Sequence, residues 1–108
     1  MKVFYDSLIQ IEYLHSQIEQ LPVSHEDKIE IIHLVEDTLH HHIIHRILIH
    51  IHEDNHPIFL DKLTRKPHDR KIIDFLKEHA AEIEDHIKEA AEEIKYDLLK
   101  LIRETTST

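Results

Sequence analysis

Apolar residues recur every three or four positions through most of this chain, and no glycine interrupts them. The first such stretch runs from Phe4 to Leu21 and the second from Ile29 to Ile51. This interval places side chains on one face of an α-helix, which has about 3.6 residues per turn. Without glycine, the chain also lacks the residue that phosphate-binding loops, dinucleotide-binding turns and tight hairpins use. The pattern predicts an all-α fold, a small antiparallel helical bundle with three main helices and one short helix.

Prolines and polar segments mark where these helices are expected to end. Leu21 precedes a proline, which disfavours helical dihedrals and ends the first helix. Ser24 or His25 then opens the second helix, and the polar segment HEDNHP follows that helix, with Asn55 as the next cap. Lys66-Pro67 ends the short helix. We therefore expect one helical domain over residues 1–108, with helices at about 3–20, 25–51, 57–65 and 68–104 and a disordered tail at 105–108.

The last of these helices carries a heptad repeat. Residues 73, 80, 87, 94 and 101 are apolar and lie seven apart, and apolar residues 76, 83 and 90 lie between them. This repeat predicts coiled-coil-like packing, in a helix roughly 55 Å long. The first helix covers only about half of that length, so we expect a homo-oligomer, with a dimer favoured, that pairs through the long C-terminal helix. The alternative is a break near Ala80-Ala81.

Composition narrows the classes of function. The formal charge of −9 leaves no excess of Lys and Arg for phosphates, so we expect no nucleic-acid binding. The sole basic cluster, KPHDRK, is broken by Asp69 and is typical of a loop and a helix start. No apolar run approaches the roughly 18 residues of a membrane span, so we expect a soluble, cytoplasmic protein with no membrane partner. Cysteine is absent, which excludes disulfides, thiolate zinc sites and cysteine nucleophiles.

Three segments of the chain read LPVSHEDKIEIIHLVEDTL, HRILIHI and FLKEHAAEIEDHIKEAAEEIK. Together they resemble a family of small helical domains of unknown function from candidate-phyla bacteria. In that family an amphipathic helix follows a leucine-proline-acidic start, and a Phe-Leu-Lys-Glu segment comes later in the chain. The resemblance covers residues 21 to 104. It implies an all-helical fold and carries no activity or site residues. Ala80-Ala81 stands where the family tends to break.

The chain has 13 histidines, many of them in the second helix, and two of these share its outward face. His41 and His45 lie one turn apart there. Their neighbours on that face are Glu30, Asp37 and His52. A histidine pair at i, i+4 is a competent two-point ligand for zinc, nickel or copper. The alternative is a solvated polar face that binds a metal only when one is offered.

A second histidine group lies nearer the predicted core. His33, Glu36 and His40 follow an H-x-x-E-x-x-x-H spacing and project to one side of the same helix. Glu36 falls within the apolar stripe, where burying a lone carboxylate is costly. These residues are therefore candidate metal ligands. Alternatively, Glu36 pairs with an arginine or histidine across a helix interface, or lies where the bundle opens to water.

Two E-x-x-H motifs link the first two helices. Glu12 with His15, and Glu30 with His33, repeat the motif that ferritin-like di-metal proteins place on two of their helices. In an antiparallel hairpin that turns near Pro22, His15 is level with Glu30 and Glu12 with His33. The motifs then point either toward each other, as a site for Zn, Ni, Cu or Fe, or both away.

Three hypotheses of different class remain. The first is a non-enzymatic, self-associating helical module that also docks to a protein partner. The second is a transition-metal-binding protein. The third is an acidic inhibitor or decoy, which would present the carboxylates of residues 82–93 to a basic partner. We favour the first, and we expect no catalytic residues and no enzymatic activity.

Overall fold

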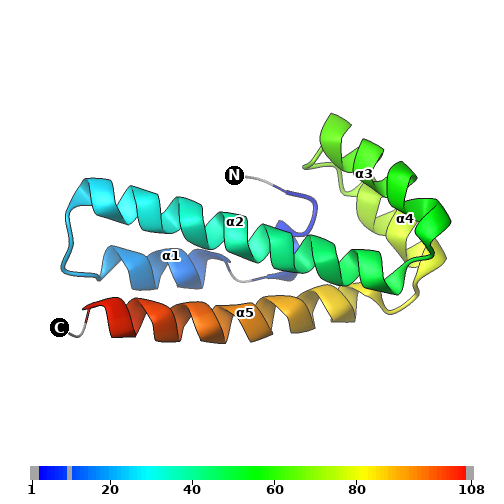
Figure 1. Ribbon diagram of the computed structural model, residues 1–108. Helices are drawn as coiled ribbons and strands as arrows, with labels where there is room; N and C mark the ends of the chain where they lie inside the picture. Colours follow the sequence, from blue (N-terminus) through cyan, green and yellow to red (C-terminus); the bar gives the residue numbers. More distant parts are fainter. Residues whose placement is uncertain (1–2, 10, 107–108) are drawn as a thin grey trace.

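The computed structural model describes residues 3–9 and 11–106, and the regular elements within them are all helical (Figure 1). The α-helices are α1 (Ile11–Glu19), α2 (His25–His50), α3 (His56–Arg65), α4 (Lys71–His79) and α5 (Ile83–Thr106). Two short 3-10 helices are η1 (Asp6–Leu8) and η2 (Glu53–Asn55). The all-α prediction is confirmed. In the described part of the chain, no helix is long and apolar enough to cross a membrane.

The bundle is built on the antiparallel pair α2 and α5 (Figure 1). Helix α1 packs against both along one half of their length, and α3 and α4 form a hairpin where α2 ends. The molecule measures 47 × 24 × 20 Å. The core follows the predicted stripe on α2, where Val35, Leu39, Ile43 and Ile47 are buried. Burial of this stripe stabilises the fold, because apolar area leaves water.

Helix α2 begins where the sequence predicts. Ser24 has extended dihedrals, and its hydroxyl oxygen accepts the backbone N–H of Asp27 at 3.1 Å, as an N-cap does. Asn55 also stands at the predicted N-cap of α3, with Pro57 in the first turn. Its side chain makes no capping bond and instead lies 3.3 Å from Nδ1 of His79. The Asn55 amide therefore ties the start of α3 to the end of α4.

The predicted first helix at 3–20 is too long, because α1 begins only at Ile11. Val3, Phe4 and Tyr5 precede the short η1 turn, and all three are buried. Three consecutive side chains on a helix point in different directions, so a helix could not bury them together. The segment is held by a long-range bond instead: the Phe4 N–H donates to the carbonyl oxygen of Pro67 at 2.8 Å.

The predicted long C-terminal helix is present as α5, but it does not run unbroken over 68–104, and the alternative of a break near Ala80-Ala81 is confirmed. Ala80 has extended dihedrals (φ −154°, ψ 96°), and α5 restarts at Ile83. Before the break Ile72 rather than Ile73 is buried, so the heptad seam is not continuous. The break lets α4 turn back onto α3. An unbroken helix of about 55 Å, from which the oligomer was expected, is therefore absent.

The other end of α5 also differs from the expected disordered tail at 105–108. Helix α5 continues to Thr106. The remaining residues of the tail, 107–108, lie outside the described part of the chain.

The apolar residues beside the main stripe of α2 have a different role from the one expected. Apolar residues at positions 31, 34, 44, 48 and 49 widen the stripe, which predicts that this helix contacts neighbours on more than one side. Ile31 is partly buried against the core. Ile44 and Leu48 are partly buried against the core, but Leu34 is 61% and Ile49 60% exposed. These two side chains lie on the face of α2 that points away from the bundle.

Candidate functional site

Four polar side chains lie together in what we call the inner cluster. They come from the segment just before η1, from α1 and from α2, and they are Tyr5, His15, Glu36 and His40. The Tyr5 hydroxyl lies 2.6 Å from Nδ1 of His40, and the two rings are stacked with centroids 5.8 Å apart. Nε2 of His15 lies 3.1 Å from Oε1 of Glu36. Glu36 and His40 are one turn apart on α2, so the two contacts are neighbours.

Burial keeps the Tyr5–His40 contact in its neutral form. Desolvation raises the pKa of Tyr5 well above its usual value, with Asp6 and Glu36 adding to the effect, so the hydroxyl stays protonated and donates. Desolvation also lowers the pKa of His40, assisted by the neighbouring His41 and opposed by Asp37. A neutral His40 can accept at Nδ1, whereas a protonated one could only donate.

The pairing of Glu36 with a histidine across a helix interface, one of the sequence-based alternatives, is confirmed by the His15 contact. Its helical neighbour His33 is exposed and joins neither contact of the inner cluster. The sequence predicted that His15 lies level with Glu30, but its partner is Glu36, six residues further along α2. Helical side chains lean toward the N-terminus of their helix, so in an antiparallel pair His15 and Glu36 lean toward each other.

The two E-x-x-H motifs contribute only His15 to this cluster. Glu12, Glu30 and His33 are all exposed. Within residues 3–9 and 11–106, no three His, Asp or Glu side chains are grouped so that they could hold a metal ion. The two-point pair His41 and His45 is exposed on the outward face of α2, as predicted. This pair is the part of the metal hypothesis that the geometry supports best.

A second set of contacts joins α2 to α5, and sequence reasoning missed it. His42, Arg46 and His50 lie one turn apart on α2. Arg46 bonds to Glu93 on α5, and Nε2 of His42 lies 3.5 Å from the same carboxylate. The hydrogen bond from Arg46 is the main reason that the pKa of Glu93 is lowered. The sequence held a signal for this contact, because α5 carries Glu89 and Glu93 one turn apart and the stripe on α2 carries an arginine and two histidines that could pair with them.

The same interface ends in a stacked histidine pair. The rings of His50 and His86 have centroids 3.6 Å apart and planes 10° apart. Burial, followed by the proximity of His86 and Arg46, lowers the pKa of His50, while Glu89 acts in the opposite direction. Two stacked imidazoles both carrying charge would repel each other. The contact therefore favours neutral rings.

The His56 side chain caps the C-terminal end of α2. Its Nε2 lies 2.7 Å from the carbonyl oxygen of Leu48 and 3.2 Å from that of Ile51, so the ring N–H donates to the end of the helix. The last carbonyls of a helix lack partners within it, and a histidine donor satisfies them. Much of the histidine content of residues 33–56 thus lies in contacts between or at the ends of helices.

We expect Ni²⁺ to bind weakly at His41 and His45, because two imidazoles one turn apart supply only part of a coordination sphere. His41→Ala should weaken binding roughly tenfold or more, since a single imidazole remains. Calorimetric titration of untagged protein at pH 7.5 measures this. His33→Ala is the matched control and should bind as the wild type does. Loss of binding in His15→Ala or His33→Ala, with His41→Ala unaffected, would instead support the di-metal site.

The chain matches no protein-family model, no curated protein and no solved structure. The resemblance to small helical domains of candidate-phyla bacteria therefore stays a prediction.

Proposed function

We propose that this chain is a non-enzymatic helical module that self-associates through the outer face of α2. This face consists of the exposed residues Glu30, Leu34, Asp37, His41, His45 and Ile49. The observation that carries the proposal is the exposure of Leu34 (61%) and Ile49 (60%) on one side of a 26-residue helix. Apolar side chains on an unpartnered helix face are typical of association surfaces when they line up along it.

The outer face of α2 suits a symmetric contact better than that of α5. Asp85, Glu89 and Glu92 are exposed along α5, and a two-fold axis would place these like charges against each other. The outer face of α2 carries only two carboxylates, with two histidines between the apolar ends. Pairing through the C-terminal helix, which the heptad repeat favoured, is therefore replaced in this proposal by pairing through α2.

The expected association is weak. Burying the exposed part of Leu34 or Ile49 contributes roughly 1–2 kcal/mol each. Loss of translational and rotational freedom opposes dimerisation by about 4–15 kcal/mol. Two chains together bury about four such side chains, so the net free energy of association is at best about −4 kcal/mol, which corresponds to a dissociation constant in the millimolar range. Such an affinity suits a module that assembles at high local concentration.

Light scattering coupled to size exclusion tests the proposal. The molar mass should rise from the 13.0 kDa of the single chain toward twice that value as the protein concentration is raised into the millimolar range. Leu34→Glu combined with Ile49→Glu should keep the chain monomeric, because charge replaces the apolar contact.

Ile58→Glu is the matched control, since Ile58 is 48% exposed on α3 and lies off this face. Its mass should rise with concentration as that of the wild type does. A mass of one chain for the wild type at every concentration would refute the proposal. So would equal dimerisation of the Leu34→Glu/Ile49→Glu variant.

A further inference from the structure

Positive charge is concentrated at one place in this acidic chain. Five of its 13 Lys and Arg residues lie within residues 62–71, and Asp69 is the one carboxylate in that range. The range covers the end of α3, the connecting turn and the first residue of α4. A chain of net charge −9 therefore carries a local excess of cations here.

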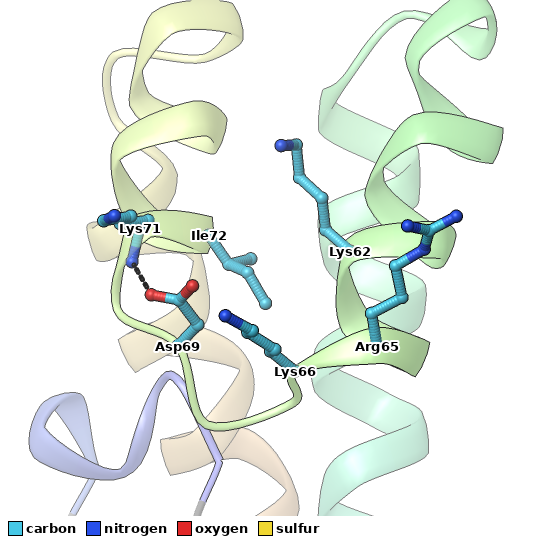
Figure 2. A pocket seen from close by; sticks show the side chains of 6 residues that line it. All are labelled: Lys62, Arg65, Lys66, Asp69, Lys71 and Ile72. Atoms are coloured by element: carbon cyan, nitrogen blue, oxygen red, sulfur yellow. Dashed lines mark hydrogen bonds between the residues drawn. The ribbon is translucent and has the colours of Figure 1, made fainter.

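These residues surround a hollow of about 200 Å³ between the end of α3 and the start of α4. Its lining consists of Lys62, Arg65, Lys66, Asp69, Lys71 and Ile72. Figure 2 shows Lys62 and Lys66 extending into the space between the two helices, while Arg65 and Lys71 lie at its outer sides. Ile72 provides an apolar wall.

The carboxylates near the hollow neutralise Arg65 but not the three lysines that line it. Arg65 pairs with Asp61 at 3.1 Å. Oδ1 of Asp69 accepts the backbone N–H of Lys71 at 3.0 Å, so this carboxylate is occupied at the start of α4. Among the described residues, no ion pair involves Lys62, Lys66 or Lys71. Lys62 instead lies 5.3 Å from the centre of the Phe75 ring.

Helix stability explains only some of these cations. Lys62 and Arg65 occupy the last turn of α3, where the negative end of the helix dipole favours positive charge. Lys71 is the first residue of α4, where the positive end of the dipole disfavours a cation. An anion in the hollow would compensate for this unfavourable placement, which the fold itself does not require.

The backbone around the hollow is held in place before anything binds. The Asp69 N–H donates to the carbonyl oxygen of Lys66 at 3.1 Å, which closes the turn. The carbonyl oxygen of Pro67 accepts the N–H of Phe4, and Phe4 is buried against Phe59. The connection between α3 and α4 is thus anchored to the core, so the backbone that carries these cations needs no rearrangement to bind an anion.

We propose that this hollow binds a phosphate group, carried either by a small soluble molecule or by a lipid headgroup. Lysine ammonium groups act as mobile point charges and bind phosphate without a fixed fork geometry. The local excess of cations favours a multiply charged oxyanion over a single carboxylate, and Asp69 opposes only part of that excess. This site lies on α3 and α4, away from the outer face of α2.

Titration with inorganic pyrophosphate at constant ionic strength tests the site in the full chain, with chemical shifts of the backbone amides as the readout. We expect saturable shifts centred on residues 62–72. Lys62→Gln combined with Lys66→Gln should weaken binding roughly tenfold, since two charge contacts are lost. Lys88→Gln combined with Lys100→Gln is the matched control. It removes the same charge from exposed lysines of α5 and should leave the affinity unchanged.

Sedimentation with phosphatidylcholine vesicles, with and without phosphatidic acid, separates the two sources of phosphate. The proposal is supported if pyrophosphate or phosphatidic acid vesicles bind the wild type and this binding is lost in Lys62→Gln/Lys66→Gln but kept in the control double variant. The probe that binds identifies the source of the phosphate. Two results would overturn it. One is the absence of binding to both probes, and the other is an equal loss of binding in both double variants, which would show a non-specific effect of net charge.

Discussion

Replacing Phe59 by alanine is expected to lower the free energy of unfolding by about 3–5 kcal/mol, the range for truncating a buried aromatic side chain. Phe59 is completely buried and is the one buried residue of α3. It also packs edge-on against Phe4, with ring centroids 6.1 Å apart. The variant therefore loses the anchor of α3 and a contact of the N-terminal segment together. Chemical denaturation followed by circular dichroism measures the change.

The neighbouring residue provides the control for this prediction. Ile58 is 48% exposed on the same helix, so Ile58→Ala should cost less than about 1 kcal/mol. Both substitutions shorten an apolar side chain and place alanine in the same helical turn. Equal effects of the two variants would mean that α3 is not held to the bundle through Phe59.

Acidification from pH 7.5 to 5.5 is expected to destabilise the fold. Burial lowers the pKa of His40 in the folded state, and partial desolvation together with the nearby His86 and Arg46 lowers the pKa of the exposed His50, so the unfolded chain binds more protons. The stability that these neutral rings contribute is complete above the unfolded pKa of about 6.5, and it is lost as the pH falls toward the lower folded values. Protonation of His40 also removes the acceptor for the Tyr5 hydroxyl.

Melting temperatures across this pH range test the prediction and assign it to a residue. His40→Gln should reduce the pH dependence, because an amide oxygen can accept from Tyr5 but does not titrate. His45→Gln is the control on the exposed side of α2 and should keep the wild-type slope. A wild-type melting temperature that rises on acidification would contradict the prediction, as would equal slopes for the wild type and His40→Gln.

The sequence predicted those structural features that depend only on residues close to each other in the chain. The cap at Ser24 and the buried stripe of α2 both follow from residues within a few positions of each other. Pairing of Glu36 with a histidine was one of the alternatives that the sequence offered, because burying a lone carboxylate on an apolar stripe is costly. The sequence did not identify the partner of Glu36 as His15, since the positions at which two helices contact each other depend on how the helices cross.

The two wrong helix boundaries have the same physical origin. Alanine is the best helix former, so nothing at Ala80 in the sequence requires the chain to leave the helix there. The break follows from packing: it allows Leu76 of α4 and Ile83 of α5 to be fully buried on helices that run in different directions. Phe4 likewise leaves the helical pattern because its N–H reaches Pro67, more than sixty positions away in the chain.

By itself, the sequence determined that this protein is helical, where α2 begins, and which of its faces is buried, because helix periodicity and capping act over a single turn. The tertiary structure alone decided the partners of the histidines. It brought His40 to Tyr5, His50 to His86 and His56 to the end of α2. It also formed the hollow at Lys62 and Lys66. Such contacts depend on the angle and the relative rotation of packed helices, and no periodicity within one helix specifies these.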